Sequence, residues 1–188
     1  MLMSQAHIWT GYGVECNQGH HGKAYRQGDD MLPKHRFEDL RQRTFDELET
    51  YFHQGTAPTL QEMTGDTDGQ FLAWRPGSGW PMKVIVWFLF RKWLGKRFHQ
   101  SKPDTSSSEG INLFQGGSLR YAFRTYVCPG RTDGAPCLRL DYSIDGLMRG
   151  LVDDVRTIDG GLVLGQIHYR FFWQKEPIFY LYFALVRK

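Results

Sequence analysis

The feature that most constrains the fold of this chain is the alternation of apolar and polar residues in its last third, residues 136–188. The runs CLRLDYS, GLVLGQIHYRFFW and PIFYLYFALVRK alternate and are separated by turn-forming Gly, Pro and Asp residues. An earlier run, SLRYAFRTYV, alternates in the same way. Such alternation places successive side chains on opposite faces of a strand, and short connections favour antiparallel hairpins.

About six antiparallel strands with aromatic faces predict a mainly β protein: an antiparallel lipocalin-like barrel or half-barrel with one or two flanking or plugging helices. Closure is favoured because strands this apolar would aggregate through an open edge. The segment 143–160 is interpreted as a partly helical excursion. The chain contains thirteen Phe, nine Tyr and six Trp residues, which either fill a core or line a ligand cavity.

Two segments are expected to be helical. Apolar residues recur at helical spacing over residues 36–53, namely Phe37, Leu40, Phe45, Leu48 and Phe52. The second segment runs from Pro81 to Gly95, two residues that suit the first position and the C-terminal cap of a helix; a strand is the alternative. Its thirteen inner residues span ~20 Å, less than the ~30 Å hydrocarbon core of a bilayer. It is either a helix that plugs the barrel or a cationic portal that touches lipid.

The length of 188 residues suits one domain, residues 36–188, preceded by an irregular segment, residues 1–35. Cys16, His20 and His21 lack a second ligand pair, so no metal site is expected. The odd number of cysteines and the absence of a signal-peptide pattern favour free thiols and a cytoplasmic location. A net charge of +3 argues against a nucleic-acid partner. The oligomeric state stays open.

Several passages carry a family resemblance. They are GDTDGQF, LGKRF followed by GINLF, and LDYS with LVDDVRTIDGGLVLGQ. Together they resemble uncharacterised bacterial lipocalin-like domains with a GxWxG signature and their associated domain of unknown function. The resemblance implies a small β-barrel that holds a lipophilic molecule, and it implies no catalytic residues.

His168 is the candidate of greatest chemical interest. Alternation places it on one strand face with Gln166 and Arg170. If this face points inward, these residues form a polar cluster in an apolar cavity, which is the usual form of a small-molecule site. The alternative is that the face points to solvent.

Other polar residues complete the candidate site. Asp141 is a second proton-transfer candidate beside His168, and Arg170 would stabilise developing negative charge. The candidate ligand-binding residues are Arg124, Arg139, Tyr142, Gln166, Tyr180, Tyr182, Asn112 and Trp87. If Arg124, Arg139 and Asp141 lie outside, they form only a surface ladder of ion pairs.

The predicted function is binding of a small lipophilic molecule, such as a lipid, isoprenoid, steroid or polyketide-like compound, inside the barrel. The alternative is a cyclase or isomerase that acts on a lipophilic biosynthetic intermediate by acid–base catalysis. No cofactor is expected. Peripheral membrane contact through residues 81–102 is a further expectation.

Overall fold

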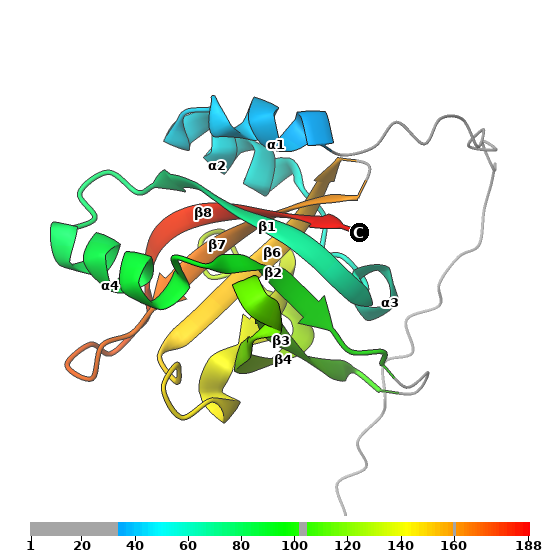
Figure 1. The fold of residues 1–188 in the computed structure, drawn as a ribbon. Coiled ribbons are helices and arrows are strands. Elements are labelled where there is room, and N and C mark those ends of the chain that lie inside the picture. Colours follow the sequence, from blue (N-terminus) through cyan, green and yellow to red (C-terminus); the bar gives the residue numbers. More distant parts are fainter. Residues whose placement is uncertain (1–33, 102–104, 160) are drawn as a thin grey trace, which may run out of the picture. The chain divides into compact units, whose positions relative to one another are not determined.

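The strands close into one antiparallel barrel, in which each strand pairs with its sequence neighbours and the last pairs with the first (Figure 1). This arrangement comes from a computed structural model, which describes residues 34–101, 105–159 and 161–188. The strands are β1 (Gly65–Trp74), β2 (Trp93–Phe98), β3 (Ser107–Phe114), β4 (Leu119–Pro129), β5 (Pro136–Asp141), β6 (Leu151–Asp159), β7 (Leu162–Tyr169) and β8 (Ile178–Arg187). The expected mainly β, lipocalin-like fold is confirmed.

Helices flank the barrel. Those among the described residues are α1 (Lys34–Arg41), α2 (Phe45–Gln54), α3 (Leu60–Met63) and α4 (Trp80–Phe90), with 3-10 turns η1 (Gln115–Gly117) and η2 (Tyr142–Ile144). Helices α1 and α2 lie outside the barrel, over β8 and β1 (Figure 1). Helix α4 connects β1 to β2 at one end of the barrel. None of the helices in the described ranges has the length and apolarity needed to cross a bilayer.

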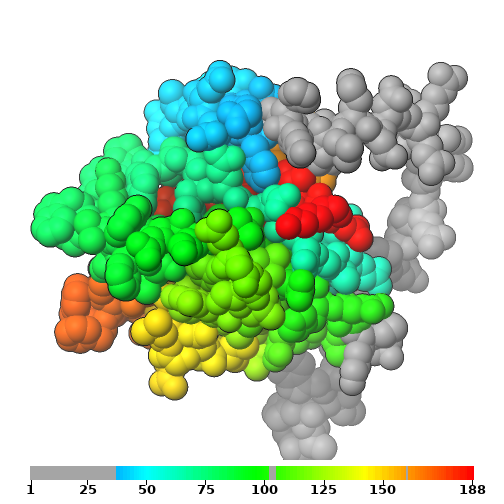
Figure 2. Space-filling view, in the orientation of Figure 1, coloured from blue at the N-terminus to red at the C-terminus, as the bar shows by residue number. Residues whose placement is uncertain are grey.

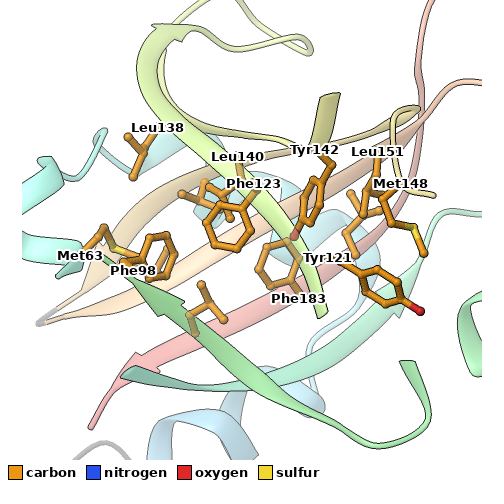
Figure 3. Close-up of a cluster of buried hydrophobic side chains, with 14 of the residues drawn as sticks. Met63, Phe98, Tyr121, Phe123, Leu138, Leu140, Tyr142, Met148, Leu151 and Phe183 are labelled. Atoms are coloured by element: carbon orange, nitrogen blue, oxygen red, sulfur yellow. The ribbon is translucent and has the colours of Figure 1, made fainter. Parts of the chain in front are cut away.

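The barrel interior is filled by apolar side chains from β2 to β8. Figure 3 shows this core, in which Phe123, Leu140, Tyr142 and Phe183 are fully buried. The alternation expected for β5 is confirmed, and that of β4 is confirmed from Tyr121 to Thr125, whereas Arg124 is exposed. It is wrong for Leu119, which is exposed because the pairing shifts at Tyr121. Burial of large aromatic and aliphatic groups supplies most of the driving force for folding.

A second apolar cluster lies on the outer face of β7 and β8, beneath α2. Leu48 and Phe52 of α2 are fully buried there against Leu164 and Tyr182. The predicted helix over 36–53 is in fact two helices. Thr44 separates them because it caps α2: its hydroxyl accepts a hydrogen bond from the Glu47 amide while the Glu47 carboxylate accepts one from the Thr44 amide.

The expected helix from Pro81 to Gly95 is correct for its first part and wrong for its end. Helix α4 ends at Phe90, and Gly95 lies within β2 rather than in a helix cap. Gly95 has φ +152°, and a Cβ there would lie 2.0 Å from the Thr67 carbonyl oxygen of β1. Gly95 is therefore required by the close approach of two strands, not by a helix terminus.

The excursion expected over residues 143–160 is also wrong in part, because residues 151–159 form β6, which pairs with β5 and β7 in the barrel. Residues 1–33 of the expected irregular segment, including Cys16 and the histidines at 20 and 21, lie outside the described residues, and its last two residues begin α1. The described residues belong to one unit, Leu32–Lys188. Cys128 and Cys137 are opposite each other on β4 and β5 as free thiols.

Irregular pairing is concentrated where the strands approach the α4 end. Extra residues interrupt the ladder at Leu94 of β2, Tyr121 of β4 and Tyr180 of β8. Such bulges change which face the neighbouring side chains occupy. The bulge at Leu94 allows both Trp93 and Lys96 to face the interior. Tyr121 has φ +57°, a rare and costly conformation for a residue with a side chain.

Candidate functional site

A buried lysine lies inside the barrel near the α4 end. Lys96 of β2 is 3% exposed. Its ammonium group donates to Asn112 Oδ1 at 2.9 Å, to the Tyr142 hydroxyl, and to Asp153 Oδ2 at 3.1 Å. These partners come from β3, the start of η2 and β6, so the barrel's closure brings them together. Three acceptors account for all three ammonium protons.

Aromatic rings surround this ammonium group. Its nitrogen lies 5.2 Å from the ring centroids of Phe123, Tyr142 and Phe183, and 5.5 Å from that of Trp93. A cation within about 6 Å of a ring centroid is attracted by the ring quadrupole. The rings therefore offset part of the cost of removing the charge from water.

Asn112 holds the network in one arrangement. Its Oδ1 accepts from the Trp93 indole nitrogen at 3.0 Å as well as from Lys96. Its Nδ2 donates to the Tyr121 carbonyl at 2.9 Å and to the Tyr142 hydroxyl at 3.2 Å. All of the hydrogen-bonding groups of this amide side chain are engaged, and the bulged backbone at Tyr121 presents one of the acceptors.

Asp153 has one oxygen without a partner. Its Oδ2 accepts from Lys96 and, at 3.2 Å, from the Tyr142 hydroxyl. Asp153 is only 1% exposed, and its Oδ1 is buried without a hydrogen-bond partner. Buried acceptors are nearly always hydrogen-bonded, so this atom marks the place where the cluster is incomplete.

A small cavity adjoins this cluster. It has a volume of about 20 Å³, and its walls include Lys96, Tyr142 and Asp153 together with Phe71, Val86, Phe90 and other apolar residues. This volume accommodates about one water molecule or one hydroxyl group. Buried apolar side chains of the described residues occupy much of the barrel interior, and the cavity beside the cluster is too small for the lipophilic molecule expected there.

A larger pocket lies on the other side of the same wall. It has a volume of about 610 Å³ and lies between α4 and strands β1 and β2. Its lining is mainly apolar, and it shares four residues with the small cavity: Phe71, Val86, Phe90 and Trp93. Pockets for small ligands commonly have volumes of 300–1,000 Å³. Thus a ligand-sized apolar pocket is separated from the buried polar cluster by a few side chains.

Burial dominates the electrostatics of the cluster. It lowers the pKa of Lys96 and raises that of Asp153, while the attraction between the two charges opposes both shifts. Burial also raises the pKa of Tyr142, which keeps its hydroxyl protonated. The phenol can therefore donate to Asp153 while it accepts from Lys96.

Of the residues predicted from the sequence, Tyr142 and Asn112 do face the interior cluster. The inward orientation considered for Gln166 and His168 is wrong: both are on the outer face of β7, with Leu162 and Leu164. The solvent-facing alternative is wrong too, because both are buried. Gln166 donates to Tyr182 at 3.0 Å and accepts from Thr132 at 3.1 Å.

His168 is 2% exposed, and neither of its ring nitrogens has a hydrogen-bond partner. Its ring packs against Phe179, with the ring centroids 5.4 Å apart. Burial lowers the pKa of His168 to about 4, so the imidazole is neutral near neutral pH.

The expected inward cluster of catalytic residues is not formed. Asp141 is on the outer face of β5, and strand β6 lies between it and His168 in the sheet, since Val152 pairs with both residues. Arg170 is exposed beyond the end of β7. The structure therefore brings none of these three side chains into the interior.

The remaining candidates are also outside. Arg139 binds Asp154 with nitrogen–oxygen distances of 2.7 and 3.0 Å, and Arg124 is exposed opposite Asp141. Trp87 is exposed on α4 and lines the 610 Å³ pocket. The last two candidates are on β8: Tyr180 forms the bulge and is half-buried, and Tyr182 is buried beneath α2.

Lys96 and Asp153 were missed as members of a site. Lys96 belongs to a basic stretch that reads as a solvated face, and Asp153 belongs to the segment interpreted as an excursion. Strand alternation could have indicated both residues. Lys96 is two positions before Phe98, and Asp153 is two positions from both Leu151 and Val155, so each shares a strand face with apolar residues. Among the residues that the structure describes, no group of His, Cys, Asp and Glu side chains has metal-binding geometry.

The fold and the site define a closed eight-stranded antiparallel barrel with a charged cluster in its interior, an architecture compatible with ligand binding. A crystal structure of a protein from Thermomonospora curvata has a similar fold, with a TM-score of 0.53 and 16% identity over 81% of this chain and 93% of that chain. No protein-family model and no curated protein matches the sequence. The resemblance to GxWxG domains stays a prediction.

Proposed function

We propose that the protein binds a small lipophilic molecule that carries a hydroxyl group. The observation that carries this proposal is the unpartnered Oδ1 of Asp153, which lies in a cluster beside the small cavity. The protons of Lys96 are already shared among acceptors of the protein itself. What the cluster lacks is a donor, so the matching ligand group donates a hydrogen bond.

The apolar part of the ligand would occupy the 610 Å³ pocket between α4 and β1. The hydroxyl would then enter the small cavity through the shared wall, of which Phe71 and Phe90 form part. This requires rotation of aromatic side chains or a shift of α4. An apolar pocket with one specific polar contact is the usual composition of a small-molecule site.

The experiment compares a medium-chain primary alcohol with the ketone of the same chain length by calorimetric titration. The native protein should bind the alcohol more tightly, because only the alcohol donates to Asp153. The Asp153→Asn variant can keep an oxygen toward Lys96 and turn its amide nitrogen to the cavity, so it should prefer the ketone. Asp141→Asn, the same change on the outer face, is the matched control and should keep the native preference.

Native mass spectrometry of freshly purified protein would identify any retained lipophile. The proposal is wrong if the native protein binds neither probe, or if Asp153→Asn leaves the preference unchanged. Circular dichroism and thermal unfolding establish that each variant is folded.

We propose as a second candidate an isomerase or cyclase that uses Asp153 as its proton acceptor. The observation that favours it is the Asp153 carboxyl group, which lines the cavity, has a pKa raised by burial and has one oxygen without a hydrogen-bond partner. Lys96 and Tyr142 would hold the other oxygen and leave Oδ1 as the reacting atom.

The test is deuterium exchange at the carbon next to the carbonyl of the ketone probe in D2O. Exchange catalysed by the native protein should disappear in Asp153→Asn and persist in His168→Ala. Exchange no faster than in buffer would remove this candidate and leave the binding proposal intact.

A further inference from the structure

Helix α4 is apolar on both of its sides. Met82 is buried, and Val86, Leu89 and Phe90 pack against the barrel core. The outer side also carries large apolar residues, and none of the described residues covers them: Trp80 and Phe88 are 75% and 69% exposed, and Trp87, at the edge of the 610 Å³ pocket, is 62% exposed. A surface helix normally carries polar residues on its outer side, so this helix has a second face that requires a partner.

Two further connections at the same end of the barrel expose apolar residues. In an antiparallel barrel the connections after β1, β3, β5 and β7 emerge at one end. The β5–β6 connection exposes Leu147, and the β7–β8 connection exposes Phe172 and Trp173, of which Phe172 is 96% exposed. Figure 2 shows α4 (green) and the β7–β8 connection (orange) protruding from the same side of the molecule. We call this surface, formed by α4 and the two connections, the apolar end.

The charge of the apolar end is mainly positive. Its exposed basic residues are Lys83, Arg91, Lys92, Arg149, Arg170 and Lys175. Acidic residues there are Asp145 and Glu176, and the sequence has no Asp or Glu between Asp68 and Asp104. Trp and Phe beside Lys and Arg are typical of surfaces that insert into the boundary between lipid headgroups and acyl chains.

We propose that the apolar end docks onto the surface of an anionic phospholipid bilayer. The exposed aromatic residues enter the headgroup boundary, while the basic residues contact lipid phosphates and carboxylates. The combination of positive charge with uncovered aromatic groups favours a bilayer over a protein partner, whose interface cores are depleted of charge. The proposal is independent of the Lys96 cluster, although docking would place the α4 pocket against the lipid.

The experiment is flotation of the protein with phosphatidylcholine vesicles and with mixed phosphatidylcholine–phosphatidylserine vesicles. The native protein should float with the mixed vesicles, and its affinity should fall as salt is raised. Two double variants test the two contributions: Phe88→Ser with Phe172→Ser removes aromatic groups, and Lys92→Glu with Lys175→Glu reverses charge. None of these four residues lines the 610 Å³ pocket, so alcohol binding should persist in both.

Each double variant should lose about tenfold or more in vesicle affinity. The matched control is Val127→Ser with Arg187→Glu, which makes the same kinds of change at exposed positions away from this end and should bind like the native protein. Brominated lipids should quench tryptophan fluorescence in the native protein.

Three results would overturn the proposal. In the first, the native protein does not float with anionic vesicles. In the second, the double variants float as well as the native protein. In the third, the native protein binds no vesicles but forms a dimer in light scattering, and the Phe88→Ser/Phe172→Ser variant is monomeric.

Discussion

Removal of the buried ammonium group tests how the interior cluster is held together. In Lys96→Met the side chain keeps a similar length but leaves Asp153, which is 1% exposed, without its counter-charge. Removing one partner of a buried ion pair typically costs about 3–5 kcal/mol. Domains of this kind have total stabilities of about 5–15 kcal/mol. We expect Lys96→Met to lower the free energy of unfolding by about 3–5 kcal/mol near neutral pH.

The loss should depend on pH in a defined direction. Burial already raises the pKa of Asp153, and loss of Lys96 removes the attraction that opposes this shift. A carboxyl group whose pKa is higher in the folded state binds protons on folding, so stability is greatest at low pH and falls as pH rises through the folded-state pKa. The deficit of Lys96→Met should therefore be smaller at about pH 5 than at about pH 8.

The double variant Lys96→Met/Asp153→Leu should recover most of the loss, because replacement of a buried pair by apolar residues of similar volume is often neutral. Urea unfolding of the native protein, both single variants and the double variant completes a double-mutant cycle at each pH. A deficit below about 1 kcal/mol that does not change with pH, or a double variant no more stable than Lys96→Met, would refute the reasoning.

Three further substitutions test the packing around the site. His168→Phe replaces a buried ring whose nitrogens lack partners; we expect it to be neutral or to stabilise the fold by about 1–2 kcal/mol at neutral pH. Because the pKa of His168 is about 4, the native fold should lose up to about 3 kcal/mol as pH falls from about 6.5 to 4, and the variant should escape this loss. Gly95→Ala should cost more than about 3 kcal/mol, since its Cβ would meet the Thr67 carbonyl. Arg139→Ala should cost about 3 kcal/mol because Asp154 is fully buried.

All three predictions are measured by urea unfolding, with Arg124→Ala as the exposed arginine control, for which a change within about 0.5 kcal/mol is expected. If the His168→Phe variant still loses stability at low pH, groups other than His168 cause the acid response. A Gly95→Ala variant as stable as the native protein would mean that β1 and β2 separate easily. An Arg139→Ala variant that behaves like the control would mean that water replaces the lost ion pair.

The sequence predicted the barrel because several of its strands alternate over part of their length, as in β4, where Phe123 is buried and Arg124 exposed. It misassigned β2 because Gly95 has two explanations, a helix cap and a close approach between strands, and only the tertiary pairing distinguishes them. The interior face of β7 was uncertain for a related reason. A polar residue such as Gln166 can be interpreted as inward-facing or solvated, whereas Gln166 is buried on the outer face, where it is hydrogen-bonded to Tyr182 of β8 and Thr132 of the β4–β5 turn.

The sequence predicted two of the four polar residues that form the interior cluster. Tyr142 and Asn112 were candidates because their types suit ligand contacts, but a lysine among arginines carries no local sign of burial. Lys96 becomes buried only when the bulge at Leu94 sets its orientation and the barrel closes around it. Bulges depend on pairing between distant segments, which local patterns do not encode.

The pairing of β1 with β8 has a consequence for how the chain folds. Gly69 pairs with Leu185, so the final seam joins segments more than one hundred residues apart in sequence. Until that seam forms, both strands present unpaired edges that can recruit other chains. We therefore expect slow, chaperone-dependent folding and a low tolerance for truncations that remove residues 178–187.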